Sequence, residues 1–277
     1  MRTVDVPAGT IAYTDDGQGP PVVLLHGVLM NHTVWDAVLP RLAGGFRVIR
    51  PDLPLGAHPV PLRPGTDLSL RGLGQLLADF LDALDLHAVT LVHSDWGGGL
   101  FLTAYGLDKR VGRLVICPCE AFGNFPPGWP GKVSALAARM PGGLALGVRQ
   151  LRVGWLRRSP LMLGQMAKHG VSDELIRAWT EPGIRDPRVL RDLRKYATTT
   201  FDPARLIADT DALATFTGDA LVLWAPENRV MPPEHGHRLA ELIPNARLRE
   251  VPDAYVLTML DQPATVAAEL NAFLGAN

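Results

Sequence analysis

The stretch Leu91-Val92-His93-Ser94-Asp95-Trp96-Gly97-Gly98-Gly99 constrains the fold of this chain more than any other. An apolar run with strand composition, residues 88–92, is followed by a polar pair, three glycines and a segment at 100–105 with the length and pattern of a helix. A strand that turns abruptly into a helix lifts one side chain above the sheet, and the glycines let the two elements approach closely. We expect Asp95, two residues before the first glycine, to take this raised position, and Ser94 to point away from it.

Three further motifs are spread over nearly the whole chain. They are Leu24-Leu25-His26-Gly27, Arg50-Pro51-Asp52-Leu53-Pro54 and Asp261-Gln262-Pro263. Together with Asp95-Trp96-Gly97-Gly98 they make the chain resemble the α/β-hydrolase superfamily, and within it the haloalkane dehalogenases and epoxide hydrolases, which use Asp as nucleophile. The resemblance implies an α/β fold with a mostly parallel eight-stranded sheet, flanking helices and a helical cap inserted after the sixth strand.

Hydrophobic periodicity predicts the individual elements. Alternating or continuous apolar runs indicate strands at 4–6, 10–13, 21–25, 46–50, 88–92, 113–117, 220–224 and 247–251. Apolar residues at helical spacing indicate helices at 34–42, 69–84, 234–243 and 265–274.

The composition changes between residues 121 and 217, where proline and glycine clusters separate short helical stretches rich in Leu, Met and Arg. We assign 121–217 to the cap, and 1–120 with 218–277 to the core. The cap has 14 Lys/Arg against 8 Asp/Glu, whereas the remainder has 13 against 20. A basic cap over an acidic body could attract an anionic substrate or an acyl carrier; alternatively, its arginines solvate helix surfaces and pair with the body.

The remaining composition argues against several classes of protein. A net charge of −1 gives no global reason to expect a nucleic acid or membrane partner. We see no signal peptide and no apolar run of the roughly 18 residues needed to span a membrane. Cys117 and Cys119 indicate buried thiols in a reducing cytoplasm. No cofactor is implied, because the sequence has no phosphate loop, dinucleotide fingerprint or metal cluster. We therefore expect a cytoplasmic protein without metal or cofactor; its oligomeric state stays open.

The family's catalytic triad is incomplete in this sequence. By resemblance, the acid position after the strand at 220–224 holds Asn228, and the histidine position before the last helix holds Val256. Glu120, after the sixth strand, occupies an alternative acid position. His32 and His58 are the candidate replacement bases, because both follow strands whose carboxyl ends face the expected cleft. Each is also open to a simpler interpretation as a loop-bracing imidazole.

The other candidate site residues also follow from the resemblance. It implies an oxyanion hole formed by the backbone N–H groups of Val28 and Trp96, with the Trp96 indole and Asn31 as donors to a leaving group. The residues expected to line the substrate pocket are Leu29, Trp129, Tyr196, Asn228 and Val256.

Three functions remain open from the sequence. The first is an enzyme in which Asp95 attacks an epoxide, carbon–halide or ester-type substrate, with His32 or His58 as base. The second is a non-hydrolytic lyase, isomerase or cyclase in which Asp95 is the general acid or base, because a carboxylate under an apolar cap suits proton transfer. The third is a ligand-binding protein without catalysis. In each, the partner is a small apolar molecule, with or without an anionic group.

Overall fold

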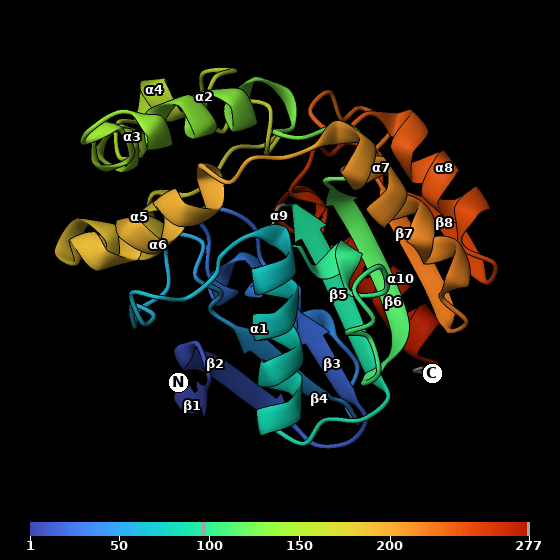
Figure 1. Cartoon of the computed structure of the whole chain (residues 1–277). Helices are drawn as coiled ribbons and strands as arrows, with labels where there is room; N and C mark the ends of the chain where they lie inside the picture. Colours follow the sequence, from blue (N-terminus) through green and yellow to red (C-terminus); the bar gives the residue numbers. More distant parts are fainter. Residues whose placement is uncertain (96–97, 276–277) are drawn as a thin grey trace.

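The computed structural model describes residues 1–95 and 98–275, and its centre is one eight-stranded sheet (Figure 1). The strand order is β1-β2-β4-β3-β5-β6-β7-β8. β1 and β2 pair antiparallel to each other, β2 pairs antiparallel to β4, and the remaining neighbours are parallel. The mostly parallel eight-stranded sheet predicted from the sequence is confirmed. The strands are β1 Arg2–Val6, β2 Gly9–Gly17, β3 Pro21–Leu24, β4 Arg47–Pro51, β5 Val89–Asp95, β6 Val111–Cys119, β7 Asp219–Trp224 and β8 Ala246–Glu250.

The register of the central strands determines where the site forms. β3, β5 and β7 are almost wholly buried, as expected for parallel strands that are covered on both faces. Leu24, the last residue of β3, pairs with Val92 in β5. The loop after β3 and the end of β5 therefore emerge side by side at the carboxyl edge of the sheet, where ligands collect in doubly wound folds.

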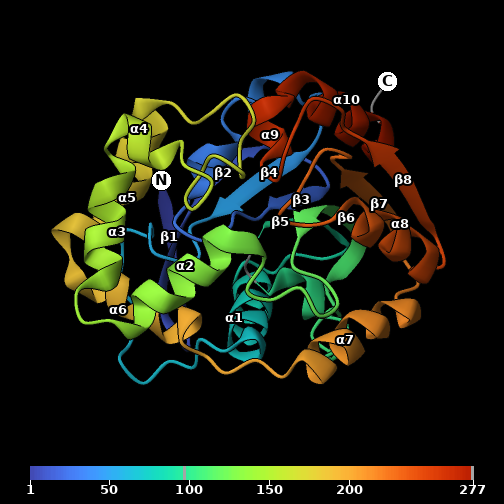
Figure 2. The same ribbon diagram turned by 90° about the horizontal axis from the view of Figure 1, so that it is seen from above.

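Helices cover both faces of the sheet (Figures 1 and 2). α1 begins after Ser69, whose side chain accepts a hydrogen bond from Gly72 N, and its apolar stripe is buried. α1 lies on the same face as α7 and α8, and α10 lies on the other (Figure 2). These helices are α1 Leu70–Ala83, α7 Pro203–Asp211, α8 Pro233–Leu242 and α10 Pro263–Leu274, with a single turn, α9 Thr258–Asp261, before the last.

A helical layer lies over the carboxyl edge of the sheet, inserted between β6 and β7 (Figure 1). It consists of α2 Gly128–Arg139, α3 Gly143–Leu151, α4 Gly154–Arg157, α5 Asp173–Arg185 and α6 Pro187–Ala197. α7, which the predicted cap range 121–217 includes, contacts the core: the Tyr105 hydroxyl donates to Asp209. The cap boundaries stay a prediction.

Two helices predicted from the sequence are replaced by shorter structure. Residues 99–101 form only a 3₁₀ turn, η3 Gly99–Phe101, followed by further turns. Gly98 and Gly106 both have positive φ, which leaves about two helical turns between them, too few to favour an α-helix. Residues 34–42 split into η1 His32–Trp35 and η2 Leu39–Arg41, because Pro40 cannot donate the hydrogen bond that a continuous helix requires.

No helix in the described ranges combines the length and the apolar character needed to cross a membrane.

Candidate functional site

Asp95 ends β5 in a left-handed backbone conformation, with φ of 59°. A non-glycine residue rarely adopts this conformation, which recurs at functional sites where the surrounding structure holds it in place. The side chain is buried, and its Oδ2 accepts a hydrogen bond from the backbone N–H of Val28 at 3.1 Å. The carboxylate is thus held from the loop after β3 by a donor of the type that an oxyanion hole provides.

Gly27 makes this approach possible. A Cβ atom built on Gly27 would lie 1.8 Å from Asp95 Oδ2 and 2.4 Å from its carboxyl carbon. The His-Gly motif therefore leaves the space that the Asp95 carboxylate fills. Its histidine fixes the neighbouring loop: Leu53 N donates to His26 Nε2 at 2.8 Å, and His26 Nδ1 lies 2.8 Å from Gly27 O.

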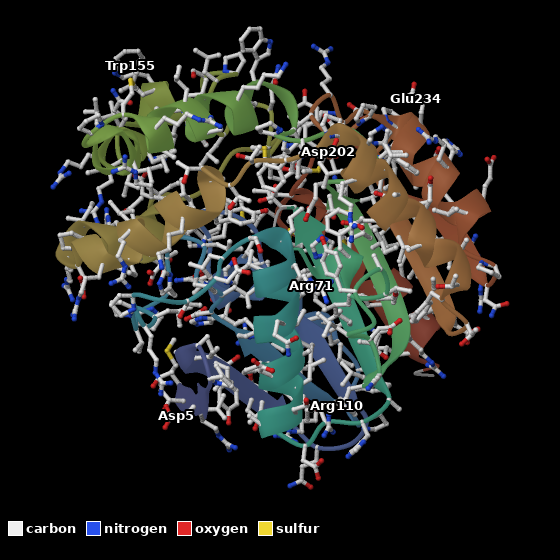
Figure 3. The ribbon with its side chains drawn as sticks, viewed as in Figure 1. Asp5, Arg71, Arg110, Trp155, Asp202 and Glu234 are labelled. Carbon is white, nitrogen blue, oxygen red and sulfur yellow. The ribbon has the colours of Figure 1, made fainter. Side chains whose placement is uncertain are left out.

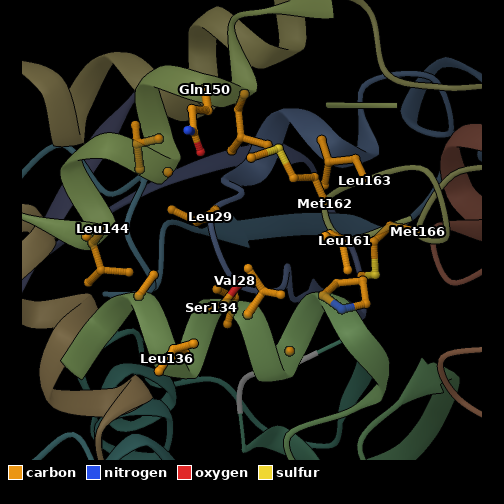
Figure 4. A pocket seen from close by; sticks show the side chains of 18 of the residues that line it. Val28, Leu29, Ser134, Leu136, Leu144, Gln150, Leu161, Met162, Leu163 and Met166 are labelled. Carbon is orange, nitrogen blue, oxygen red and sulfur yellow. The ribbon is translucent and has the colours of Figure 1, made fainter. Parts of the chain in front are cut away.

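Asp95 opens into a cavity of about 270 Å³ between the core and the cap (Figure 4). The walls come from residues 28–30 of the core and, in the cap, from α2, α3 and the segment 161–166. Among the described residues that line it, Asp95 has the one ionisable side chain, Ser134 supplies a hydroxyl group and Gln150 supplies an amide. Leu29 lines the cavity, as the sequence predicts. The arrangement is an apolar chamber with a single carboxylate at one end.

Glu120 lies below the turn at Asp95 and is not among the described residues that line the cavity. Its Oε1 accepts a hydrogen bond from Gly98 N at 3.0 Å, and its Oε2 lies 3.4 Å from Nε2 of His93. Its backbone N–H donates to Asp95 O at 3.4 Å. These contacts indicate that Glu120 supports the two ends of the turn that carries Asp95.

His93, Cys119 and Glu120 are the described residues whose ligand atoms gather closely enough, within 4.8 Å of one another, to hold a metal ion. Burial and the adjacent Glu120 carboxylate raise the pKa of the Cys119 thiol well above its usual value, which disfavours the thiolate that metals bind. One Glu120 oxygen is already bound to Gly98 N. The donor set therefore fits a buried hydrogen-bonded brace, and the absence of a metal stays a prediction.

Tyr196 is fully buried in α6, with the rings of Phe125 and Phe201 nearby. Burial, with the charges of Glu120 and Asp95, raises the pKa of its hydroxyl well above the usual value. The phenol therefore lies close to both carboxylates and stays protonated. It does not appear among the described residues that line the cavity, where the sequence placed it.

The two histidines predicted to replace the missing base have other partners. His32 Nδ1 lies 2.8 Å from Asp52 Oδ1, which also accepts the His32 backbone N–H. His58 Nε2 lies 3.3 Å from Asp192 Oδ2, a carboxylate of α6. Neither imidazole belongs to the described lining of the cavity. Both side chains hold loops to neighbouring elements, and the structure gives no support to either as the base.

Four further candidate residues have surroundings other than those expected from the sequence, and a fifth lies outside the described residues. Asn31 caps η1 by accepting from Thr33, and its amide donates to Ala178 O. Trp129 is 62% exposed, and Lys132 Nζ lies over its ring, 5.6 Å from the centroid. Asn228 accepts from two backbone N–H groups of its own loop, and Val256 is part of the hydrophobic core. None of these four lines the cavity among the described residues. Trp96 lies outside the described residues.

Sequence reasoning missed the polar groups of the cavity wall and the pairing of His93 with Glu120. Ser134 interrupts the apolar run at 133–138 of α2, which is the signal that could have marked it, whereas Gln150 follows Arg149 in α3 and has no such signal. His93 lies in a wholly buried strand, and a lone histidine there gives no indication of its partner.

The sheet order, the strained Asp95 at the end of β5 and the helical layer over it define the α/β-hydrolase architecture. The model of the alpha/beta hydrolase family matches residues 22–269, and the chain belongs to this family. The resemblance inferred from the sequence motifs is confirmed.

Individual relatives match over shorter regions. A haloalkane dehalogenase of Mesorhizobium japonicum is 34% identical over 139 residues, which are 48% of this chain and 44% of that protein. A soluble epoxide hydrolase of Corynebacterium is 36% identical over 106 residues, which are 38% of this chain and 36% of that protein. These matches span less than half of each relative. The crystal structure of a haloalkane dehalogenase from Agrobacterium tumefaciens matches with a TM-score of 0.75 at 22% identity, covering 99% of this chain and 96% of that one, and so supports the fold.

Proposed function

We propose that this protein is a small-molecule enzyme in which the Asp95 carboxylate attacks an electrophilic carbon of an apolar substrate, such as an epoxide or a carbon–halide compound. The observation that carries the proposal is the position of Asp95, which has the one ionisable side chain among the described residues around an apolar cavity. Two of the relatives named above are called haloalkane dehalogenase and epoxide hydrolase.

The first step forms a covalent ester. One Asp95 oxygen donates an electron pair to the substrate carbon, and the bond from that carbon to the halide or the epoxide oxygen breaks, with its electron pair leaving on that atom. Val28 N–H holds Asp95 Oδ2, which orients the carboxylate while the other oxygen reacts. The apolar walls exclude water from the nucleophile and favour an apolar substrate.

The second step, hydrolysis of the ester, lacks the usual base. Water must add to the Asp95 carboxyl carbon, and the oxyanion that forms is stabilised by Val28 N–H. General-base assistance contributes roughly 10²–10⁴-fold to such a step, and no imidazole is found among the described lining residues. We therefore expect the ester to form faster than it is hydrolysed, and to accumulate.

The same observation favours a second candidate, in which Asp95 transfers a proton and no ester forms. A carboxylate in an apolar chamber whose described lining residues include no imidazole is suited to an elimination, isomerisation or cyclisation. A reaction in water enriched in ¹⁸O separates the two. Ester hydrolysis incorporates solvent oxygen, at first into Asp95 and from there into the product, whereas proton transfer by Asp95 incorporates none. Tight binding without turnover, unchanged in Asp95→Asn, would instead indicate a ligand-binding protein.

A further inference from the structure

The outer layer of the cap exposes an unusual number of large apolar side chains. Seven of the nine exposed large hydrophobic residues in the described chain lie between residues 129 and 161. We call this surface, with its exposed basic residues, the α2–α4 face. Trp155, which is 75% exposed, lies on its outer side, away from the sheet (Figure 3). The apolar members are Trp129, Leu136, Met140, Leu146, Val153, Trp155 and Leu161, and the basic members are Lys132, Arg139, Arg149, Arg152 and Arg158.

Helical spacing places these side chains in stripes. On α2, Trp129, Lys132, Leu136 and Met140 follow one another at intervals of three or four residues and are all exposed, so they share one side of the helix. On α3 and its end, Leu146, Arg149 and Val153 repeat the pattern. Because α2 packs against α3, the two stripes belong to the same layer of the cap.

The charge of this face is of one sign. From residue 121 to residue 172 the sequence contains seven Lys/Arg and no Asp or Glu. Arg152 and Arg157 pair with Glu181 and Asp173 of α5. Within the described part of the chain, the other four basic members of the face form no salt bridge, so their charge is not neutralised by a neighbouring carboxylate: Lys132, Arg139, Arg149 and Arg158.

The face is continuous with the cavity above Asp95. Leu136, Met140, Leu146 and Leu161 are exposed and also line the cavity, so they form the rim of its mouth (Figure 4). A molecule that enters past them meets apolar surface all the way from the outside of the cap to the interior.

We propose that the α2–α4 face binds peripherally to an anionic lipid surface, with the cavity mouth opening into the lipid. Tryptophan and aliphatic side chains interleaved with Lys and Arg have the composition of segments that lie in the membrane interface, where the apolar groups insert and the cations meet anionic headgroups. An apolar substrate dissolved in the lipid then reaches Asp95 without passing through water. The net charge of the whole chain is near zero and gives no indication of the basic α2–α4 face, because the acidic residues lie outside this face.

Two other occupants fit the face less well. A second copy of the chain docked through the same face would bring the unpaired cations against each other, and like charges in contact oppose association. An acidic protein would match the charge, but the polar surface of such a partner would not cover seven large apolar side chains. An anionic lipid surface matches both properties.

The experiment measures binding of the full chain to large unilamellar vesicles by flotation. Vesicles of phosphatidylcholine with an equal part of phosphatidylglycerol should bind the protein, vesicles of phosphatidylcholine alone much less, and high salt should weaken the binding. Arg149→Gln should weaken partitioning about fivefold, the contribution of one basic residue near an anionic surface. Arg247→Gln, an exposed arginine in β8, is the matched control and should leave it unchanged.

The orientation is tested with brominated lipids, which quench tryptophan fluorescence on contact. Quenching should be lost in Trp129→Phe/Trp155→Phe when both proteins carry Trp96→Phe, because the remaining Trp35, Trp179 and Trp224 are buried in the protein. Failure to bind anionic vesicles, binding unaffected by Arg149→Gln, or quenching that persists in the double variant would each overturn the proposal. A dimer that Trp129→Phe/Trp155→Phe dissociates would overturn it as well. The readout requires no turnover, so it is independent of the proposed function.

Discussion

Gly27 and Asp95 are packed so closely that the side chain of one occupies the space where a Cβ of the other would lie. The calculated separation, 1.8 Å from that Cβ to Asp95 Oδ2, is far below any van der Waals contact. The carboxylate and its donor, Val28 N–H, therefore depend on a glycine at position 27.

Gly27→Ala should lower the reactivity of Asp95 roughly 10²-fold. The added methyl group forces the carboxylate away from Val28 N, and a displacement of about 1 Å at a reacting group costs roughly 10²-fold in rate. The rate of ester formation with an epoxide probe measures the effect. Gly44→Ala is the control, because a Cβ there meets no atom within 4 Å. A Gly27→Ala variant as reactive as the parent would show that the reaction does not require Asp95 Oδ2 to remain hydrogen-bonded to Val28 N.

His26 should make the stability of the protein depend on pH. Burial lowers the pKa of His26 from 6.5 to about 4. Between pH 6.5 and 4, His26 is protonated in the unfolded chain but neutral in the folded chain. The free energy of unfolding therefore falls by about 3 kcal/mol over this range. Urea unfolding of the parent and of His26→Gln at both pH values isolates this contribution. An equal pH dependence in the two proteins would rule out a neutral His26 as its source.

Glu120→Ala should destabilise the turn below Asp95 strongly. It removes the acceptor of Gly98 N–H and the carboxylate beside His93, both buried, and breaking a buried pair costs about 3–5 kcal/mol. Glu120→Gln should cost less, because an amide oxygen can still accept from Gly98 N. Thermal unfolding compares the two variants. Equal losses would indicate that the charge of Glu120, rather than its acceptor, stabilises the turn.

Two glycines of α3 should respond oppositely to alanine. A Cβ on Gly147 meets open space at the cavity wall, so Gly147→Ala should gain up to about 1 kcal/mol from helix propensity. A Cβ on Gly143 would lie 2.2 Å from Ala137 O, so Gly143→Ala should destabilise the contact between α2 and α3. Differential scanning calorimetry of the pair checks the sign of each change. A destabilised Gly147→Ala would mean that the cavity wall has no room for a methyl group.

The strands and helices that could be predicted from the sequence are those with long hydrophobic patterns. The continuous apolar runs of β3, β5 and β7 marked the parallel core, and the stripe of α1 with its Ser69 cap marked the longest flanking helix. The segment after Asp95 was predicted as a helix, but its length is limited by Gly98 and Gly106, whose positive φ values no periodicity reveals.

The candidate site was predictable only where backbone geometry determines it. Asp95 and Val28 are placed by the ends of two adjacent strands, so motif spacing was sufficient. His32 and His58 were chosen by their place in loops, but their orientation depends on Asp52 and Asp192, which lie 20 and 134 residues away in the sequence. Trp129 was assigned to the cavity by residue type, whereas its position on α2 turns it outward.

The most direct test of the proposed function is mass spectrometry of the protein after incubation with a small apolar epoxide or alkyl halide. Because the described cavity has a carboxylate and no imidazole, we expect a stable adduct on the peptide that contains Asp95, and none in Asp95→Asn. A probe consumed without an adduct on Asp95, or consumed equally by Asp95→Asn, would contradict nucleophilic attack by this carboxylate.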